Sequence, residues 1–178
     1  KFFLLAVIAD FLSYFAAVTG VFLLSWRFNG VGGMDKYEVL FMLGYVTTCT
    51  GIFQTFFANS NTGHISRRIG RGQMEHMLIQ PLPLPIQLIT EGFIPVSGSS
   101  NLISGAIIIG VAVKNLGFQP SLGWVGLLLL HLLTTILILL FLSYLFSSAA
   151  FYAPVQAEEI SSHVLDSTGI LSTYPLSG

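Results

Sequence analysis

Residues 124–146, WVGLLLLHLLTTILILLFLSYLF, form an apolar run without a single charged side chain. A helix needs about 20 mostly apolar residues to cross a bilayer, so this run predicts a membrane span. Runs at 2–25, 37–58 and 96–113 predict three more spans. Only 8% of the residues are charged, whereas a soluble domain has about 25%. We therefore expect an all-α fold, a polytopic transmembrane helical bundle with four spans present.

A lead-in at 86–95 precedes the third span and contains Glu91 and Pro95. We expect it to be either a helix lying at the membrane interface or the first part of a broken helix. The run at 2–25 is not followed by a small-residue cleavage site and a soluble domain, so it is not interpreted as a cleaved signal peptide. The whole chain, 1–178, is expected to form a single transmembrane domain.

Basic residues in the loop 59–86 predict the orientation of the chain. Arg67, Arg68 and Arg71 lie in this loop, and loops rich in lysine and arginine stay on the cytoplasmic side of a membrane. The N-terminus and the tail, 152–178, are then inside the cell. We expect a multi-pass protein of the cell (cytoplasmic) membrane.

Several classes of function are disfavoured by the composition and by missing motifs. A net charge of −1 gives no basic footprint for nucleic acid, and the single Cys49 allows neither a disulfide framework nor a cysteine zinc site. The sequence contains no G-x-x-x-x-G-K-[ST] phosphate loop, H-E-x-x-H zinc motif or G-x-S-x-G elbow. We expect no catalytic residue, no metal site and no cofactor bound directly by this chain.

The stretch 67–85, RRIGRGQMEHMLIQPLPLP, predicts a short amphipathic helix in the basic loop. Two glycines before the helix can break the chain, and three prolines after it keep the helix short. The residues alone leave two interpretations open: an interfacial helix whose arginines touch anionic headgroups, or a docking element for a soluble partner. Apolar residues recur at i, i+3, i+4 and i+7 on one helix face, at Met74, Met77, Leu78 and Pro81.

This stretch resembles the cytoplasmic loop before the third span of type-2 ATP-binding-cassette (ABC) exporter permeases. In one branch of that family the loop contains isoleucine, arginines and glycine, then acidic and leucine positions and a proline–leucine repeat. Two further stretches are similar to the family, VGGMDKYEVLFMLGY at 31–45 and YPLSG at 174–178. The matching loop positions are Ile69, Arg71, Gly72, Gln73, Met74, Glu75, Leu78, Pro81 and Leu82.

The resemblance implies a permease subunit powered by a separate ATPase subunit, which binds ATP with Mg. The segment 67–80 would be a coupling helix that docks on the ATPase, and a second permease would complete a homodimer or a paralogous heterodimer. The chain stops just before the fifth span of the family, so we expect a fragment that lacks the last two helices. The implied docking residues are Arg67, Arg68, Arg71, Gln73, Met74, Glu75, His76, Met77 and Leu78.

The spans contain few charged groups, so the expected cargo is an amphipathic compound, a drug or a lipid-like molecule, exported from the cell. One alternative is a small structural membrane protein that oligomerises through small-residue faces without transport. A membrane-embedded enzyme ranks lower. Polar residues inside spans are functional hypotheses by default, either along a pathway or between helices: Asp10, Glu91, Asn101 and His131.

Small residues in the second and third runs favour a simpler explanation. Gly44, Thr48 and Gly51 in one run, and Ser104 and Gly105 in the other, are small enough to let two helices approach closely. We expect these positions to serve helix packing rather than substrate binding.

Overall fold

The computed structural model describes only part of the chain. The predicted first span, 2–25, and the tail, 152–178, lie largely outside the described residues, and Asp10 lies outside them altogether. The described residues are 8–9, 12–13, 15–16, 19–20, 22–23, 26–27, 33–57, 62–92, 95–117, 119–153, 155–157, 159–160, 163–164 and 167.

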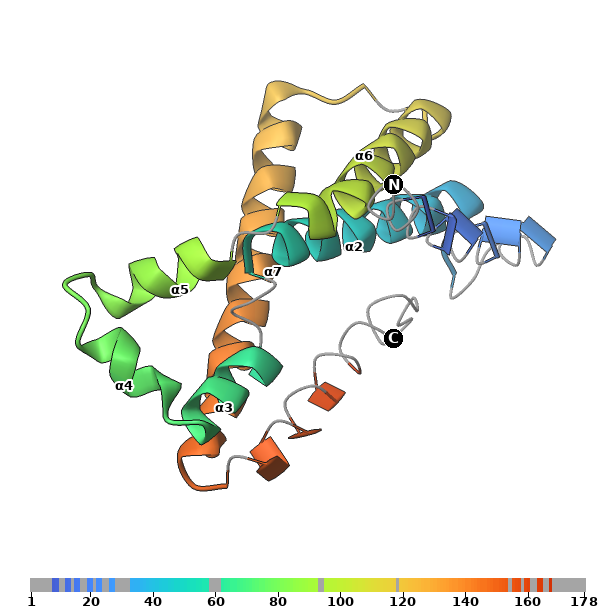
Figure 1. Ribbon diagram of the computed structural model, residues 1–178. Helices are drawn as coiled ribbons and strands as arrows, with labels where there is room; N and C mark the ends of the chain where they lie inside the picture. Colours follow the sequence, from blue (N-terminus) through green and yellow to red (C-terminus); the bar gives the residue numbers. More distant parts are fainter. Residues whose placement is uncertain are drawn as a thin grey trace.

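The described residues are mostly helical and contain no β-strand, as expected for an all-α fold. Figure 1 shows the helices in chain order. Three of them match the apolar runs predicted from the sequence, to within two residues at each end. The elements are α2 (Lys36–Phe57), α3 (Thr62–Gly70), α4 (Gln73–Leu78), α5 (Leu84–Gly92), α6 (Pro95–Asn115), α7 (Leu122–Ser148) and the 3₁₀ helix η2 (Ala149–Phe151).

Local hydrogen bonds explain where the long helices begin. The backbone N–H of Asp35 donates to Glu38 Oε2 at 2.9 Å just before α2, which is one half of a capping box. At the start of α7, Ser121 Oγ accepts from the N–H of Trp124 at 3.2 Å. α6 begins at Pro95, whose missing N–H is harmless in a first turn. The polar residues beside each apolar run therefore set the helix boundaries.

Helices α2 and α6 pack closely against each other (Figure 1). A Cβ added to Gly51 would lie 2.5 Å from the backbone nitrogen of Leu102, and one added to Gly105 would lie 2.6 Å from that of Thr48. Real atoms do not approach so closely, so these positions accept glycine only. The prediction that the small residues serve close helix packing is confirmed for this pair.

Two described segments are long and apolar enough to cross a membrane: α2 and the stretch Leu122–Phe151, formed by α7 and η2. Helix α6 is not in this set. The predicted spans at 37–58 and 124–146 thus coincide with helices of membrane length. The predicted third span coincides with a 21-residue helix of similar length.

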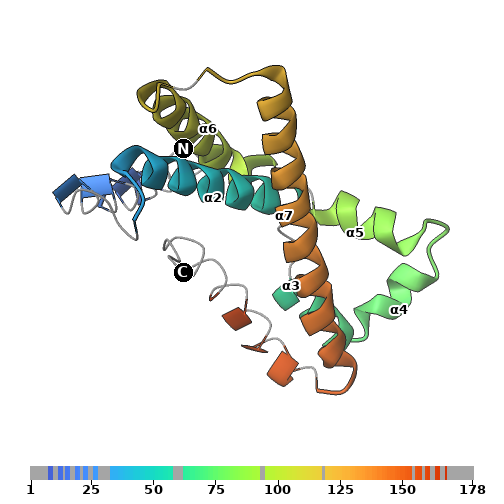
Figure 2. The same cartoon turned by 180° about the vertical axis from the view of Figure 1, so that it is seen from behind.

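Helix α7 is exposed over most of its apolar surface. Only 11% of the most apolar 18-residue stretch of Leu122–Phe151 is buried within the molecule, against 50% for the corresponding stretch of α2. Both views show α7 crossing α2 instead of lying alongside it (Figures 1 and 2). The described helices therefore contain a packed pair, α2 and α6, and α7 contacts α2. The predicted four-span bundle also includes the span at 2–25, which lies largely outside the described residues. An apolar surface of this size is typical of contact with lipid or with other membrane helices.

Helices α3, α4 and α5 form a separate arm, which we call the elbow (residues 62–92). Its first helix, α3, packs against α7 and η2, and its last helix, α5, reaches α2. Helix α4 lies between them, away from the α2–α6 pair (Figures 1 and 2). The lead-in to the third predicted span is a helix of its own, which ends at Gly92 before α6 begins at Pro95. A separate helix here fits both alternatives, a helix at the membrane interface and the first part of a broken helix, so the choice between them stays a prediction.

Candidate functional site

The basic loop contains a break within the predicted coupling segment 67–80. Arg67 and Arg68 lie in the last turn of α3, where a positive charge is favourable because the C-terminal end of a helix dipole is negative. Arg71 lies in the turn after α3 and is exposed. The segment therefore comprises the end of one helix, a turn and a second short helix.

Gly72 makes the turn between α3 and α4. Its φ of 68° lies in the left-handed region, where a residue with a Cβ atom is strained. The N–H groups of Arg71 and Gly72 donate to the carbonyls of Arg67 and Ile69, each at 3.0 Å, and so close the end of α3. The prediction that a glycine breaks the chain before a new helix is confirmed here.

Helix α4 has only six residues, because the prolines that follow it end the helix, as predicted. One of its six side chains, Met74, is half-buried. The exposed residues of α4 are Gln73, Glu75, His76 and Leu78.

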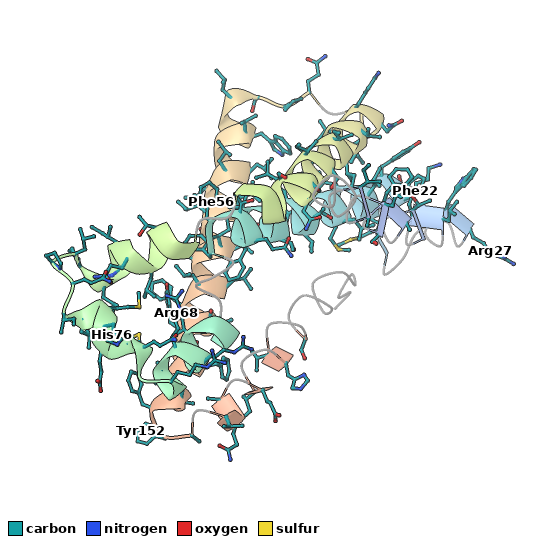
Figure 3. All side chains as sticks on the ribbon, viewed as in Figure 1. Phe22, Arg27, Phe56, Arg68, His76 and Tyr152 are labelled. Carbon is teal, nitrogen blue, oxygen red and sulfur yellow. The ribbon has the colours of Figure 1, made fainter. Side chains whose placement is uncertain are left out.

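Met77 is the one buried residue of α4, with 5% of its surface exposed. Nη1 of Arg68 donates toward Met77 Sδ at 3.7 Å, and the Met77 carbonyl accepts from Gln87 Nε2 at 3.0 Å. Residues from α3, α4 and α5 therefore meet at Met77, and Figure 3 shows Arg68 inside the elbow. Met77 is expected from the sequence to lie on the docking surface, but in this structure its side chain is buried within its own chain.

Large apolar side chains are exposed at the bend between α4 and α5. Leu78 is 65% exposed and Ile79 is 79% exposed, and Leu82 and Ile86 are also exposed. We call these four residues the apolar patch. Only Leu78 was among the docking residues expected from the sequence. The others follow α4, and the signal that could have identified them is the alternation of leucine with proline at 81–85.

The elbow is joined to α7 through small residues. Ser66 of α3 is fully buried, and so are Ser143 and Ser147 of α7 and Ala150 of η2. Because α3 packs against both α7 and η2, we infer that these buried residues lie in that contact, which we call the serine contact. The sequence analysis did not assign these serines a role.

The amide of Asn101 lies between α2 and α6. Asn101 is buried, and its Nδ2 donates to Gln54 Oε1 at 2.7 Å. The alternative of a polar contact between helices fits this position. Gln54 was not predicted, although it is the only amide side chain within the second apolar run.

Another pair of polar residues joins α2 to α7. The hydroxyl of Tyr45 lies 2.7 Å from Thr135 Oγ1, while Thr134 donates to the Leu130 carbonyl of its own helix. His131, which was expected to make the bond between helices, is exposed on α7. Within the described residues, the interhelical bond of this region therefore belongs to Tyr45 and Thr135.

Glu91 and Asp10 are the two remaining positions predicted from the sequence. Glu91 lies in α5, one residue before the helix ends, and Asp10 is outside the described residues. In the part of the chain that the structure describes, no three histidine, cysteine or acidic residues gather in a way that could hold a metal ion.

Together, the membrane-length helices and the projecting elbow define a helical membrane protein. The sequence model of a family described as "ABC-2 family transporter protein" matches residues 8–177, and the chain belongs to this family. The resemblance inferred from the sequence is thereby confirmed, and the chain is a membrane permease of the ABC transporter class. Permeases of this family normally work with an ATPase subunit. Searches among curated proteins and among solved structures gave no match.

Proposed function

We propose that the chain is the membrane-spanning permease subunit of an ABC exporter that moves an amphipathic compound, a drug or a lipid-like molecule, out of the cell. A separate ATPase subunit binds ATP with Mg and docks on α4 and the apolar patch. Family membership supports the permease assignment. The geometry of the elbow supports the position of the docking surface.

The exposed apolar patch is the observation on which the docking proposal rests. Leu78 and Ile79 present apolar side chains outward from the end of a short helix, and such a helix end fits an apolar groove on a partner. Fully burying one leucine or isoleucine side chain is worth about 1.5–3 kcal/mol. These two residues could therefore supply a large share of the docking free energy, with Gln73, Glu75 and His76 at the polar rim.

The arginines have different roles in this proposal. Arg68 points toward Met77 within the elbow, so we assign it to holding α4 against α3. Arg71 is exposed beside α4, and Arg67 is exposed one turn earlier in α3. In the proposal, these two guanidinium groups face acidic residues at the rim of the ATPase groove. The alternative is that they hold phospholipid headgroups.

Motion of α4 has two routes to the membrane helices. Met77 joins α4 to both neighbouring helices; α3 continues to α7 through the serine contact, and α5 continues to α2. ATP binding would bias an equilibrium between two arrangements of the permease. The elbow would transmit that bias to α7 and to the α2–α6 pair together.

The proposal includes an arrangement in the cell membrane. The N-terminus, the elbow and the tail would face the cytoplasm, because the basic residues of 59–86 favour that side. Four spans of this chain would cross the bilayer, within one permease domain. A second permease, either an identical copy or a paralogue, and two ATPase subunits would complete the transporter.

Association with an ATPase tests the proposal. Affinity-purified permease should retain ATP-hydrolysing activity from a co-expressed ABC ATPase, and Leu78→Glu should abolish this retention because a carboxylate would enter the apolar groove. Leu122→Glu is the matched control, since Leu122 is also exposed but lies at the opposite end of α7 from the elbow. Equal retention by both variants would refute docking at the apolar patch.

Charge reversal separates the two roles proposed for the exposed arginines. Replacing Arg67 and Arg71 together with glutamate should weaken ATPase association if they face an acidic rim. Unchanged ATPase association, together with weaker binding to vesicles that contain anionic lipid, would assign the arginines to headgroups.

A further inference from the structure

Gln87 is a buried amide at the junction of α4 and α5. It lies one turn inside α5, and only 2% of its surface is exposed. Its Nε2 donates two hydrogen bonds, to the Met77 carbonyl at 3.0 Å and to the Leu82 carbonyl at 2.6 Å. One side chain of α5 therefore holds the end of α4 and the segment that connects the two helices.

The local sequence explains why a side chain must supply these bonds. The last carbonyls of a helix have no partner within it, and Met77 is the penultimate residue of α4. The connecting segment is rich in proline, which has no N–H to donate. The one backbone donor to the Met77 carbonyl is Gln80 N–H, at a long 3.4 Å. The two hydrogens on Gln87 Nε2 supply the donors that the backbone lacks here.

The other end of the Gln87 amide shows which atom matters. Its Oε1 is buried and has no hydrogen-bond partner among the described residues, which costs free energy. The amide nitrogen of Gln87 makes both hydrogen bonds, and these bonds explain why a glutamine occupies this position despite the cost at Oε1. Glutamate has the same shape but would place an acceptor against two carbonyl oxygens.

We propose that Gln87 is a positioning residue that fixes the angle between α4 and α5, so that α5 moves as one body with the docking helix. This inference rests on the proposed docking of an ATPase at α4 for its role in transport. The geometry itself concerns this chain alone. Without the two bonds, α4 would remain attached through Arg68 and Met77 to α3, but its movement would no longer be passed on to α5.

Spin-label distances on the full chain in lipid nanodiscs test the inference without any ATPase. Labels are attached at His76→Cys on α4 and Thr90→Cys on α5, in a Cys49→Ala background. Gln87→Met keeps the volume of the side chain but removes both donors, and Gln87→Glu replaces donors by acceptors. Gln80→Met is the matched control, because Gln80 lies at the same bend and its side chain is exposed. A reference pair, Lys114→Cys with Leu129→Cys, reports the distance between α6 and α7.

The inference predicts a narrow distance distribution between positions 76 and 90 in the parent and in Gln80→Met. Both Gln87 variants should broaden and shift this distribution while the reference distance stays unchanged. An unchanged distribution in the Gln87 variants would overturn the inference. A simultaneous change in the reference distance would also overturn it, because a role confined to the elbow does not alter the arrangement of α6 relative to α7.

The same variants separate this inference from the proposed function. If docking occurs at the apolar patch, Gln87→Met should still retain the co-expressed ATPase but should transport less cargo for each ATP hydrolysed. A different result is that the Gln87 variants alter the distance between positions 76 and 90 while the parent protein retains no ATPase. That result would support the role of Gln87 in the fold and refute the docking proposal.

Discussion

Asn101 on α6 donates a 2.7 Å hydrogen bond from its Nδ2 to Oε1 of Gln54 on α2. The bond lies beside Gly51, whose absent side chain lets the backbones approach. Small residues and one amide pair thus act together. The glycines bring the helices close, and the amides fix their register, since a shift along the helix axis would separate Asn101 from Gln54.

Asn101→Leu should destabilise the protein by about 1 kcal/mol, because interhelical hydrogen bonds in membranes average about 0.6 kcal/mol and reach about 1.7 kcal/mol. The free energy of unfolding in mixed detergent checks this. Asn115→Leu is the control, since within the described residues the Asn115 side chain bonds to the Val111 carbonyl of its own helix. Equal losses for the two variants would contradict the assignment.

Gly105→Ala should destabilise the protein by about 1–3 kcal/mol, the usual cost of overpacking a tight contact. The added Cβ would lie 3.0 Å from the Gly44 carbonyl oxygen and closer still to Thr48. Gly110→Ala, in the same helix, has nothing within 4 Å of its added Cβ and should be neutral or slightly stabilising. Comparison of the two unfolding midpoints checks the contact, and a similar midpoint for both would argue against it.

Tyr45 and Thr135 should show a coupling free energy of about 0.5–1.5 kcal/mol, the net value of an ordinary hydrogen bond. A double-mutant cycle with Tyr45→Phe and Thr135→Val measures it. The parallel cycle with Thr134→Val should be additive, because Thr134 bonds within its own helix. If both cycles were additive, Tyr45 and Thr135 would not be bonded, and α7 would lie in a different position relative to α2.

Ser143→Leu should separate α3 from α7, since a leucine does not fit where Ser143 is completely buried. The readout is maleimide labelling of Ser66→Cys in a Cys49→Ala background. The parent should resist labelling because Ser66 is buried, whereas the Ser143→Leu variant should label readily. Ser148→Leu, at an exposed position of the same helix, should leave Ser66→Cys protected. Rapid labelling of the parent would contradict the serine contact.

The sequence predicted what depends on local pattern. Apolar runs and their polar flanks placed α2, α6 and α7, and Gly72 with the prolines predicted a short helix between two breaks. These features follow from hydrophobic periodicity and backbone preferences, which act over a few residues. The family resemblance also rested on local stretches, at 31–45, 67–85 and 174–178.

The remaining features depend on contacts between distant residues. An apolar helix face at Met74, Met77 and Leu78 does not indicate whether it contacts a partner or another part of the same chain. In the structure Met77 is buried and bonds to Arg68 and Gln87. The partners Gln54 and Asn101 are far apart in the sequence, so no local pattern pairs them. The sequence favours His131 for a bond across helices, because threonines often bond back to their own helix, but in the structure the position of Tyr45 gives this bond to Thr135.

The most direct test of the central claim, that α4 docks on an ATPase, is photo-cross-linking from position 76 in native membranes. A photoreactive phenylalanine replaces His76, which is exposed on α4, and a second protein with the same residue in place of Leu122 serves as the control. The account predicts a covalent adduct from position 76 only, with a protein whose peptides include a G-x-x-x-x-G-K-[ST] phosphate loop. Adducts from position 76 with lipid alone would contradict the account and identify α4 as an interfacial helix.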